Sequence, residues 1–360
     1  MLQTALHDWH VSHKGRMVPF AGWEMPIQFT SIVEEHHAVR HGCGLFDIAH
    51  MGRLWFRGTD HVRLLDHLLT NHVERMQTGQ VRYSLMCRKD GGILDDVLVY
   101  RFDNECLLVV NASNRKKIVD WIEMHREGHE VDVTDSTTDS FMLAIQGPRA
   151  EQILQLQTPA ELSKIRYYRA VQTEVCGIPA VLSRTGYTGE DGFEVTVPND
   201  RGVELWETLL EAGAEQGITA CGLGCRDTLR LEAAMPLYGH EMDESMDPLT
   251  AGLAFGVRLE KPVDFLGKDA LQKIQSQPRP ETRIGIQLQG KRIAREGAQL
   301  MHGNEAIGRV TSGTFSPTMQ VPIAMGYVAP RYSEAGTELE VEVRGRREPA
   351  RVVPLPFYKR

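Results

Sequence analysis

The segment after about residue 282 constrains the fold most, because its pattern permits strands and almost no helix. Short runs that alternate apolar and polar residues lie at 284–288, 307–310, 323–328, 339–343 and 350–354, with Gly, Pro and Asn turns between them. Regularly spaced short strands of this kind predict a small all-β barrel or sandwich. The stretch Gln277-Pro278-Arg279-Pro280 just before them predicts a domain boundary.

The preceding residues mix helical and strand patterns irregularly. Ser31 and Glu34 have capping-box spacing, and the helical pattern behind them runs on to Cys43. Further helices are expected after Asp60 and near 114–126, 149–156, 200–215 and 268–275, with strands at 53–56, 82–87, 94–102, 106–111, 140–146, 180–183 and 193–197. These segments do not alternate as βαβ units, and no G-x-G-x-x-G follows a strand. We therefore predict an α+β fold with mostly antiparallel sheets rather than a Rossmann domain.

Composition excludes several classes of function. A chain of 360 residues favours two or three domains, and its net charge of -8 argues against nucleic acid as a partner. Six cysteines show no paired framework, and the C-x3-C spacing of Cys221 and Cys225 lacks a second half-site for zinc. The polar, His-rich start is unlike a secretory signal, and no apolar run approaches the roughly 20 residues that span a bilayer. Free thiols, no bound metal and no membrane segment are the expectation.

The segment Gly91-Gly92-Ile93-Leu94-Asp95-Asp96 carries the sharpest chemical signal. Strand alternation places Asp96 on one face with Leu98 and Tyr100, and Asp95 on the other. An ionised carboxylate on an apolar strand face is costly unless it is paired, so this arrangement indicates a functional site. The alternative is an Asp pair that ends a turn, with side chains in water or capping backbone amides. The spacing does not match a calcium loop.

Two further segments are candidates for binding. Residues 184–194 contain three glycines that form a tight loop before a strand, from which Tyr187 could stack on a flat ring and Glu194 could accept two hydrogen bonds. Residues 221–232 read as a Gly-rich turn that opens an amphipathic helix, with Arg226 near its start. Arginine there opposes the helix dipole, so an anionic partner, either protein or ligand, is expected. A surface hairpin and a surface ion pair are the plain structural alternatives.

Weaker candidates are an apolar loop at 20–26, the lone histidine of His50-Met51-Gly52, and residues 313–318, which read as a turn. Together with Phe46–Asp47, 91–96, 146–148, 184–194, 224–227 and 239–244, these segments strongly resemble the aminomethyltransferase, or T-protein, family of the glycine cleavage system. The segments occur in the family's order, and the resemblance runs from Leu6 to Tyr358. Each motif is weak alone, but the ordered set is specific.

The resemblance implies a three-domain folate-binding fold with a C-terminal antiparallel β-barrel. On this basis residues 1–276 should hold two interleaved α+β domains, the second at roughly 52–138, and residues 277–360 the barrel. The substrate would be an aminomethyl group on the lipoyl arm of the partner H-protein, with tetrahydrofolate as cosubstrate. The products would be 5,10-methylenetetrahydrofolate, ammonia and the reduced arm. A cytoplasmic bacterial enzyme is expected, or a mitochondrial matrix enzyme if a transit peptide has been removed.

The resemblance also implies roles for individual residues. Asp96 matches the family's catalytic aspartate, whose charge would orient the folate amine nitrogens and stabilise the cation formed as ammonia leaves. The positions that match the family's folate cavity are Met51, Tyr83, Tyr100, Asn111, Tyr187, Glu194, Arg226 and Tyr358. Glu194 suits the donor edge of the pterin. The split of roles between Glu194 and Arg226 stays open.

Two rival functions share this scaffold. A folate-dependent demethylase would differ only in details of the pocket. A non-catalytic folate-binding factor for iron–sulfur protein assembly would carry a Lys-Gly-Cys-x-x-Gly-Gln-Glu type segment, which this sequence lacks. We therefore expect the aminomethyltransferase activity.

Overall fold

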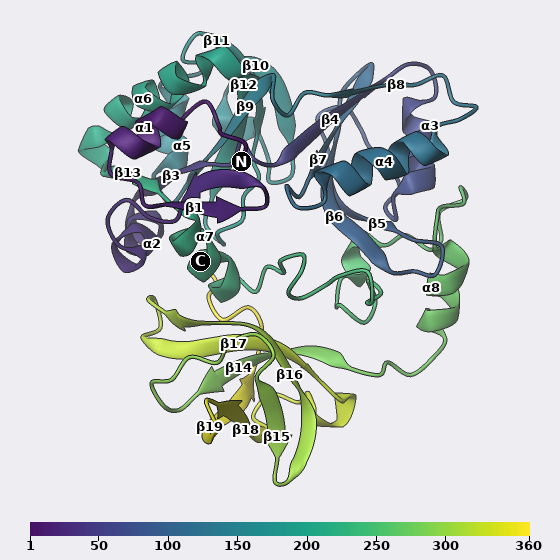
Figure 1. The fold of residues 1–360 in the computed structure, drawn as a ribbon. Coiled ribbons are helices and arrows are strands. Elements are labelled where there is room, and N and C mark those ends of the chain that lie inside the picture. The colour runs from purple at the N-terminus through teal and green to yellow at the C-terminus, as the bar shows by residue number, and fades with distance from the viewer.

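A computed structural model describes residues 1–360 and contains three large β-sheets (Figure 1). Two sheets with their helices lie side by side, and the third, formed by the C-terminal part of the chain, lies below them (Figure 1). The last residues return from this third sheet to the first, where the Tyr358 amide donates to the Glu232 carbonyl at 2.8 Å. None of the helices combines the length and the apolar character needed to cross a membrane.

The first sheet has six strands and helices on both faces. Along β9, Phe141, Leu143 and Ile145 enter the core under α1, α5 and α6, whereas Met142 and Ala144 enter the core under α2 and α7. This period of two is what a strand buried on both sides requires. The strands, in spatial order, are β10 (Ala170–Val175), β11 (Ile178–Ser183), β12 (Gly192–Pro198), β9 (Ser140–Gln146), β3 (Cys43–Asp47) and β13 (Ile218–Cys221). The helices are α1 (His7–Ser12), α5 (Ala150–Gln155), α6 (Gly202–Ala212), α2 (Ile32–His41) and α7 (Leu223–Glu232).

The second sheet has five strands, and two helices cover one of its faces. In β6, Val97 and Val99 pack with α3 (His61–Leu68) and α4 (Arg115–His125), while Tyr100 lies in a cluster that includes Ala170 of the first sheet. The opposite face is directed at the first sheet near Tyr100, and at Leu85 it packs against residues 242–271. The strands, in spatial order, are β5 (Val81–Cys87), β6 (Ile93–Arg101), β7 (Glu105–Val110), β4 (Gly52–Arg57) and β8 (Asp132–Asp135).

The third sheet closes into a six-stranded barrel around an apolar core of Ile, Leu, Val and Ala side chains. Helix α8 (Lys268–Gln275) precedes it, and near the N-terminus β1 (Met17–Phe20) and β2 (Trp23–Pro26) form a separate hairpin. The barrel strands are β14 (Thr282–Leu288), β17 (Val321–Val328), β16 (Glu305–Ser316), β15 (Gln299–His302), β18 (Glu338–Val343) and β19 (Arg346–Val353).

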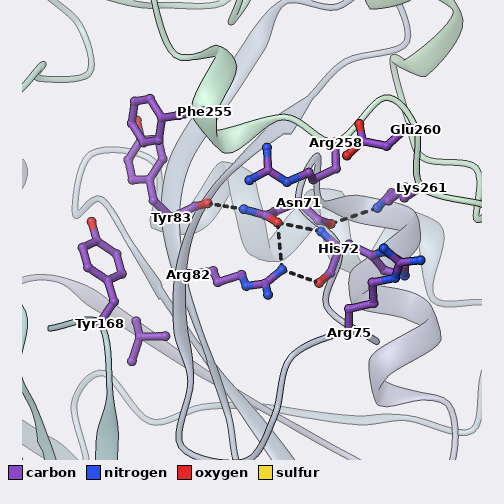
Figure 2. A pocket seen from close by; sticks show the side chains of 11 residues that line it. Asn71, His72, Arg75, Arg82, Tyr83, Tyr168, Phe255, Arg258, Glu260 and Lys261 are labelled. Atoms are coloured by element: carbon purple, nitrogen blue, oxygen red, sulfur yellow. Dashed lines mark hydrogen bonds between the residues drawn. The ribbon is translucent and has the colours of Figure 1, made fainter. Parts of the chain in front are cut away.

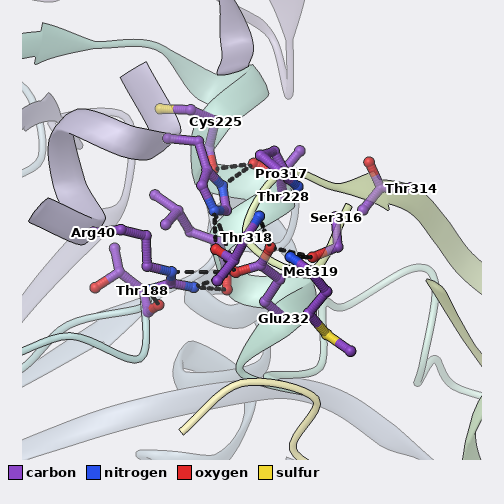
Figure 3. A network of polar contacts seen from close by, with 12 residues as sticks. Arg40, Thr188, Cys225, Thr228, Glu232, Thr314, Ser316, Pro317, Thr318 and Met319 are labelled. Atoms are coloured by element: carbon purple, nitrogen blue, oxygen red, sulfur yellow. Dashed lines mark hydrogen bonds and ion pairs between the residues drawn. The ribbon is translucent and has the colours of Figure 1, made fainter. Parts of the chain in front are cut away.

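A buried carboxylate fastens the barrel to the first sheet (Figure 3). Glu232, at the end of α7, accepts hydrogen bonds from Ser316 Oγ at 2.5 Å and from Thr318 Oγ1 at 2.8 Å. The same carboxylate pairs with Arg40 of α2 at 2.9 Å and lies 3.2 Å from His36 Nε2. These partners lower the pKa of Glu232 to about 2 against the opposing effect of burial. One side chain therefore joins two helices and the barrel.

The structure confirms the predicted fold class and most of the predicted elements. All pairs between named strands are antiparallel except β3 with β13. The helices expected near 114–126, 149–156, 200–215 and 268–275 are α4, α5, α6 and α8, and Ser31 Oγ caps α2 by accepting from the Glu34 amide at 3.2 Å.

Two local predictions were wrong. The helical pattern does not reach Cys43, because α2 ends at His41 and Cys43 begins the buried strand β3. Residues 313–316 are not a turn but the end of β16, where Thr314 pairs with Ile323 of β17. At Cys43 pairing with strands far away in the sequence overrode the local pattern, and at residues 313–316 pairing with the next strand along the chain did so.

Candidate active site

The turn before β6 requires glycine. Gly91 has φ +91°, a conformation that residues with a side chain rarely adopt, and a Cβ on Gly92 would lie 2.2 Å from the Glu244 carbonyl oxygen. The Asp90 carboxylate closes the turn by accepting from the Gly92 amide at 3.1 Å. The close approach of two backbone segments therefore fixes where β6 begins.

Strand alternation directs Asp96 toward the first sheet, as predicted from the sequence. Its Oδ2 accepts a hydrogen bond from Tyr83 Oη at 3.1 Å, and its Oδ1 accepts one from Asn111 Nδ2 at 2.7 Å. The carboxylate is partly exposed, and no cation lies within 4 Å of it. Burial raises the pKa of Asp96, while its two hydrogen-bond donors oppose that rise. Two neutral hydrogen-bond donors therefore hold the Asp96 carboxylate in place, and no cation of the protein pairs with its charge.

Asp95 points the opposite way and is fully buried. Its carboxylate accepts from the Asn111 amide at 3.0 Å, from Asn111 Nδ2 at 2.9 Å and from Asn114 Nδ2 at 2.5 Å. Burial, and secondly the negative charge of Asp96, raise the pKa of Asp95. Asn111 donates hydrogen bonds to both carboxylates, so it links the buried Asp95 to the partly exposed Asp96. The turn-end alternative, with both side chains in water, does not describe this pair.

Glu194 approaches from β12 on the first sheet. Its Oε2 accepts from Thr185 Oγ1 at 2.5 Å and from Tyr100 Oη at 3.5 Å, which joins the two sheets, while its Oε1 accepts no hydrogen bond within the protein. Burial raises the pKa of Glu194, against the effects of Thr185 and of the positive charge of Arg226. The carboxylate therefore keeps one oxygen available to a ligand.

Arg226 lies on α7 beside the same space. Its guanidinium carbon is 4.8 Å from the centroid of the Tyr187 ring, and its Nη1 is buried without a hydrogen-bond partner. The expected protein ion pair is absent, because Asp227 pairs with Arg230 instead and Glu194 lies beyond 4 Å. Burial lowers the pKa of Arg226. An unpartnered guanidinium opposite a carboxylate with a free oxygen is an arrangement that a polar ligand would complete.

Most of the other predicted site residues lie around the space between the first and second sheets. Tyr358 does not. Met51 packs against the core clusters of both sheets, and Tyr187 is fixed by a hydrogen bond from its Oη to the Pro236 carbonyl at 2.6 Å. Tyr358 lies elsewhere, with its ring 4.0 Å from the guanidinium carbon of Arg40. Its nearest charged groups are Arg40, Glu190 and Glu232, around the barrel contact described above.

Comparisons with known proteins identify the family. Residues 6–261 match the family model described as "GCVT N-terminal domain", and residues 282–359 match "Glycine cleavage T-protein C-terminal barrel domain". The chain belongs to the glycine cleavage T-protein family. An aminomethyltransferase of Symbiobacterium thermophilum is 47% identical over 99% of this chain and 97% of its own length. One of Desulfitobacterium hafniense is 45% identical over 99% of this chain and 98% of its own length.

A solved structure agrees. The glycine cleavage system aminomethyltransferase T of Bartonella henselae superposes with a TM-score of 0.92 at 32% identity, covering 99% of this chain and 98% of that one. This T-protein family member is therefore an enzyme, an aminomethyltransferase that transfers one-carbon units in glycine cleavage. The demethylase and the iron–sulfur assembly factor are not favoured.

Sequence reasoning missed several residues around the site of this aminomethyltransferase. Thr185 and Asn114, which hold Glu194 and Asp95, had no recognisable signal, because their roles depend on contacts between segments far apart in the chain. Tyr168, just before β10, lies close enough to both Glu194 and Asp96 for their charges to raise its pKa, in addition to the larger effect of burial. The adjacent aromatic pair Tyr167-Tyr168 was a signal that could have been used.

The two thiols that the sequence places at C-x3-C spacing lie together beside a carboxylate. Cys221, Cys225 and Glu35 bring possible ligand atoms within 4.8 Å of one another. The Glu35 carboxylate already accepts from the backbone amides of Phe29 at 2.6 Å and Gly222 at 2.8 Å. Its oxygens therefore tie the β2–α2 loop to the start of α7, which is a structural role.

Proposed function

We propose that this aminomethyltransferase uses tetrahydrofolate as cosubstrate and takes the aminomethyl group from the lipoyl arm of an H-protein. The observation that carries the proposal is the pair of facing walls. Asp96 and Tyr83 lie on one sheet, while Glu194 and Arg226, each with unused hydrogen-bonding capacity, lie on or beside the other. The membership of the family supports the choice of substrates.

The residues present fit a reduced pterin. Glu194 Oε1 would accept from the donor edge of the ring, and the guanidinium of Arg226 would donate to an oxygen. Tyr187 offers a rigid aromatic face, and Met51, Tyr100 and Asn111 would line the same space. Tyr358 remains a predicted contact that this arrangement does not favour.

Asp96 is the proposed catalytic residue. In the reaction the transferred carbon exchanges its bonds to sulfur and to the amino nitrogen for bonds to two folate nitrogens. The hydrogens of those two nitrogens end on the sulfur and on the released ammonia, so atoms balance without oxidation or reduction. An anionic Asp96 would stabilise the positive charge that develops on carbon and nitrogen, and would accept a proton from a folate nitrogen. Tyr83 and Asn111 would hold its two oxygens in position.

We also propose the boundaries of the units that build this site. The region 1–276 would contain two interleaved α+β domains, the second at roughly 52–138, and 277–360 would form the barrel domain. The separate cores of the three sheets support this division. A cytoplasmic location belongs to the proposal as well, since the relatives named above come from bacteria.

The deciding experiment is an assay of the purified chain with tetrahydrofolate and aminomethyl-loaded H-protein. We expect stoichiometric formation of 5,10-methylenetetrahydrofolate and ammonia. Absence of product, together with methyl transfer from another donor, would favour the demethylase instead.

A direct titration tests the binding residues. Glu194→Ala and Arg226→Ala should each weaken tetrahydrofolate binding about tenfold or more, since each would remove a charge-assisted hydrogen bond. Glu207→Ala, on the exposed side of α6, is the matched control. Unchanged affinity in both site variants would reject this assignment.

A further inference from the structure

Two histidines lie one turn apart on the outer side of α2. His37 is partly buried and His41 is exposed, and their side chains are neighbours because residues four apart share one side of a helix. Their ring centroids are 5.4 Å apart, and the ring planes differ by only 16°. Two histidines at this spacing on a helix are the pair that holds zinc in helical metal motifs.

The ring nitrogens of this pair are not used by the rest of the protein. His37 Nδ1 is buried without a hydrogen-bond partner, and neither its Nε2 nor a nitrogen of His41 takes part in a hydrogen bond. The neighbouring His36 differs, since it contacts Thr228 Oγ1 at 2.8 Å and Thr318 Oγ1 at 2.9 Å. His37 and His41 therefore keep lone pairs available to a partner from outside the protein.

The charges around the pair favour a cation. Glu34, one turn earlier on the same side of the helix, is exposed and forms no ion pair within 4 Å. The nearest cation in the sequence, Arg40, is paired with Glu190 and Glu232, each at 2.9 Å. His41 is the last residue of α2, where the helix carbonyl groups carry a partial negative charge. A positive ion is therefore stabilised at this end of the helix.

The geometry suits a divalent transition metal. With Zn–N bonds of about 2.0–2.1 Å in a tetrahedral arrangement, two ligand nitrogens lie roughly 3.3 Å apart. Facing rings with centroids 5.4 Å apart can reach this separation by rotation about their terminal torsions, which are soft for histidine. Imidazole nitrogen is a ligand for Zn²⁺, Ni²⁺ and Cu²⁺, whereas Mg²⁺ and Ca²⁺ prefer oxygen. Water would supply the remaining ligands.

Two other groups of possible metal ligands are already engaged within the protein. His72 lies near Asp66 and Glu74, at a cavity of about 540 Å³ that adjoins the proposed active site (Figure 2). The Asp66 carboxylate accepts from the Val73 amide at 2.7 Å and from the Glu74 amide at 2.9 Å. The second group is the pair of thiols beside Glu35, whose carboxylate is tied to backbone amides as described above. The histidine pair on α2 has no such competing role.

We propose that His37 and His41 bind one divalent transition-metal ion, Zn²⁺ or a cation with the same ligand preference, at the end of α2. The inference does not depend on the proposed function, because it uses no residue of the proposed active site. On the same helix, His36 and Arg40 contact Glu232 and thereby fasten the barrel to the first sheet (Figure 3). A metal that bridges the last turn of α2 would hold the helical conformation on which this contact depends.

The test measures binding of Zn²⁺ by calorimetry to the full chain without a histidine affinity tag. We expect one ion per chain and a higher thermal unfolding midpoint when the ion is bound. His37→Asn and His41→Asn should each weaken binding about tenfold or more, since each removes one of the two protein ligands. His302→Asn, at an exposed histidine of β15, is the matched control and should bind Zn²⁺ as the unaltered protein does.

Cu²⁺ provides a separate count of the ligands. Its electron paramagnetic resonance spectrum should show coupling to two nitrogens in the unaltered protein and to one in each variant. Absence of Zn²⁺ binding, or equal binding in the two variants, would overturn the proposal, because the ion would then be unbound or held elsewhere. His41 is exposed, so its replacement leaves the core intact and decides the question even if the His37 variant folds poorly. Circular dichroism checks the fold of each variant.

Discussion

Replacement of Asp96 by asparagine should lower activity and raise stability at the same time. The amide can keep both hydrogen bonds of the carboxylate, because Asn111 Nδ2 can still donate to its oxygen and the Tyr83 hydroxyl can reorient. Only the negative charge and the proton-accepting capacity are lost. Since positioned acid–base groups contribute about 10²–10⁴-fold, turnover should fall by about that factor.

The gain in stability follows from the pKa of Asp96. Burial raises it from 3.8 to about 6, so ionisation costs the folded state about 3 kcal/mol at pH 7.5 relative to the unfolded chain. An acid with a raised folded pKa supports folding most below pH 3.8 and loses that contribution as the pH rises to about 6. Asparagine has no charge to desolvate, and without the charge of Asp96 the pKa of Asp95 is raised less. After the weaker neutral hydrogen bonds are allowed for, the variant should gain about 1–3 kcal/mol at pH 7.5.

The measurements are single-turnover rates with loaded H-protein and urea unfolding at pH 7.5 and pH 5. The stability gain should be smaller at pH 5, where the native carboxyl already carries its proton for most of the time. Asp139→Asn removes the same charge from an exposed position and should change neither quantity by much. A variant with near-normal turnover, or one that is less stable at pH 7.5, would refute the reasoning, because Asp96 would then be a structural side chain.

Three further predictions concern the same framework. Because the pKa of Asp96 is about 6 and its anion is the proposed active form, kcat/KM should fall about tenfold per pH unit below pH 6; a flat profile from pH 5 to 8 would contradict this role. Gly92→Ala forces a Cβ to within 2.2 Å of the Glu244 carbonyl and should cost about 1–3 kcal/mol in urea unfolding, together with a loss of turnover. Glu232→Ala removes one of the two carboxylates that pair with the buried guanidinium of Arg40 at 2.9 Å and should cost about 3–5 kcal/mol; a thermal unfolding midpoint equal to that of the unaltered protein would show the barrel contact to be dispensable.

The sequence predicted those features of the fold that depend on the pattern of neighbouring residues in the chain. Strand alternation assigned Asp96 and Asp95 to opposite faces, and the structure has them there. The alternating runs after residue 282 predicted the barrel, although not that it closes, because closure depends on the pairing of β14 with β19. Local patterns fix which face a side chain takes, whereas partners far apart in the chain decide the sheet to which it belongs.

The environment of the site could not be predicted in this way. Thr185 and Asn114 act through neighbours brought close only by the fold. Arg226 shows the limit most clearly, since its position at the start of a helix predicted an anionic partner and the folded chain provides none within 4 Å. The remaining alternative at that position was a ligand. Only the resemblance to the family suggested that this ligand is a folate.

The glycine turn decides which of two adjacent aspartates faces the cavity. In the β5–β6 ladder Asp96 pairs with Leu85, and a register shift at Met86 and Cys87 sets this pairing just after the turn. A slip of one residue would reverse every side chain of β6, burying Asp96 against α4 and directing Asp95 at the opposite sheet. Asn111 opposes such a slip, because it binds both carboxylates and can do so in only one register. The catalytic role proposed for Asp96 therefore depends on strand register, so changes in the turn at Gly91 and Gly92 should affect activity more than their distance from the carboxylate suggests.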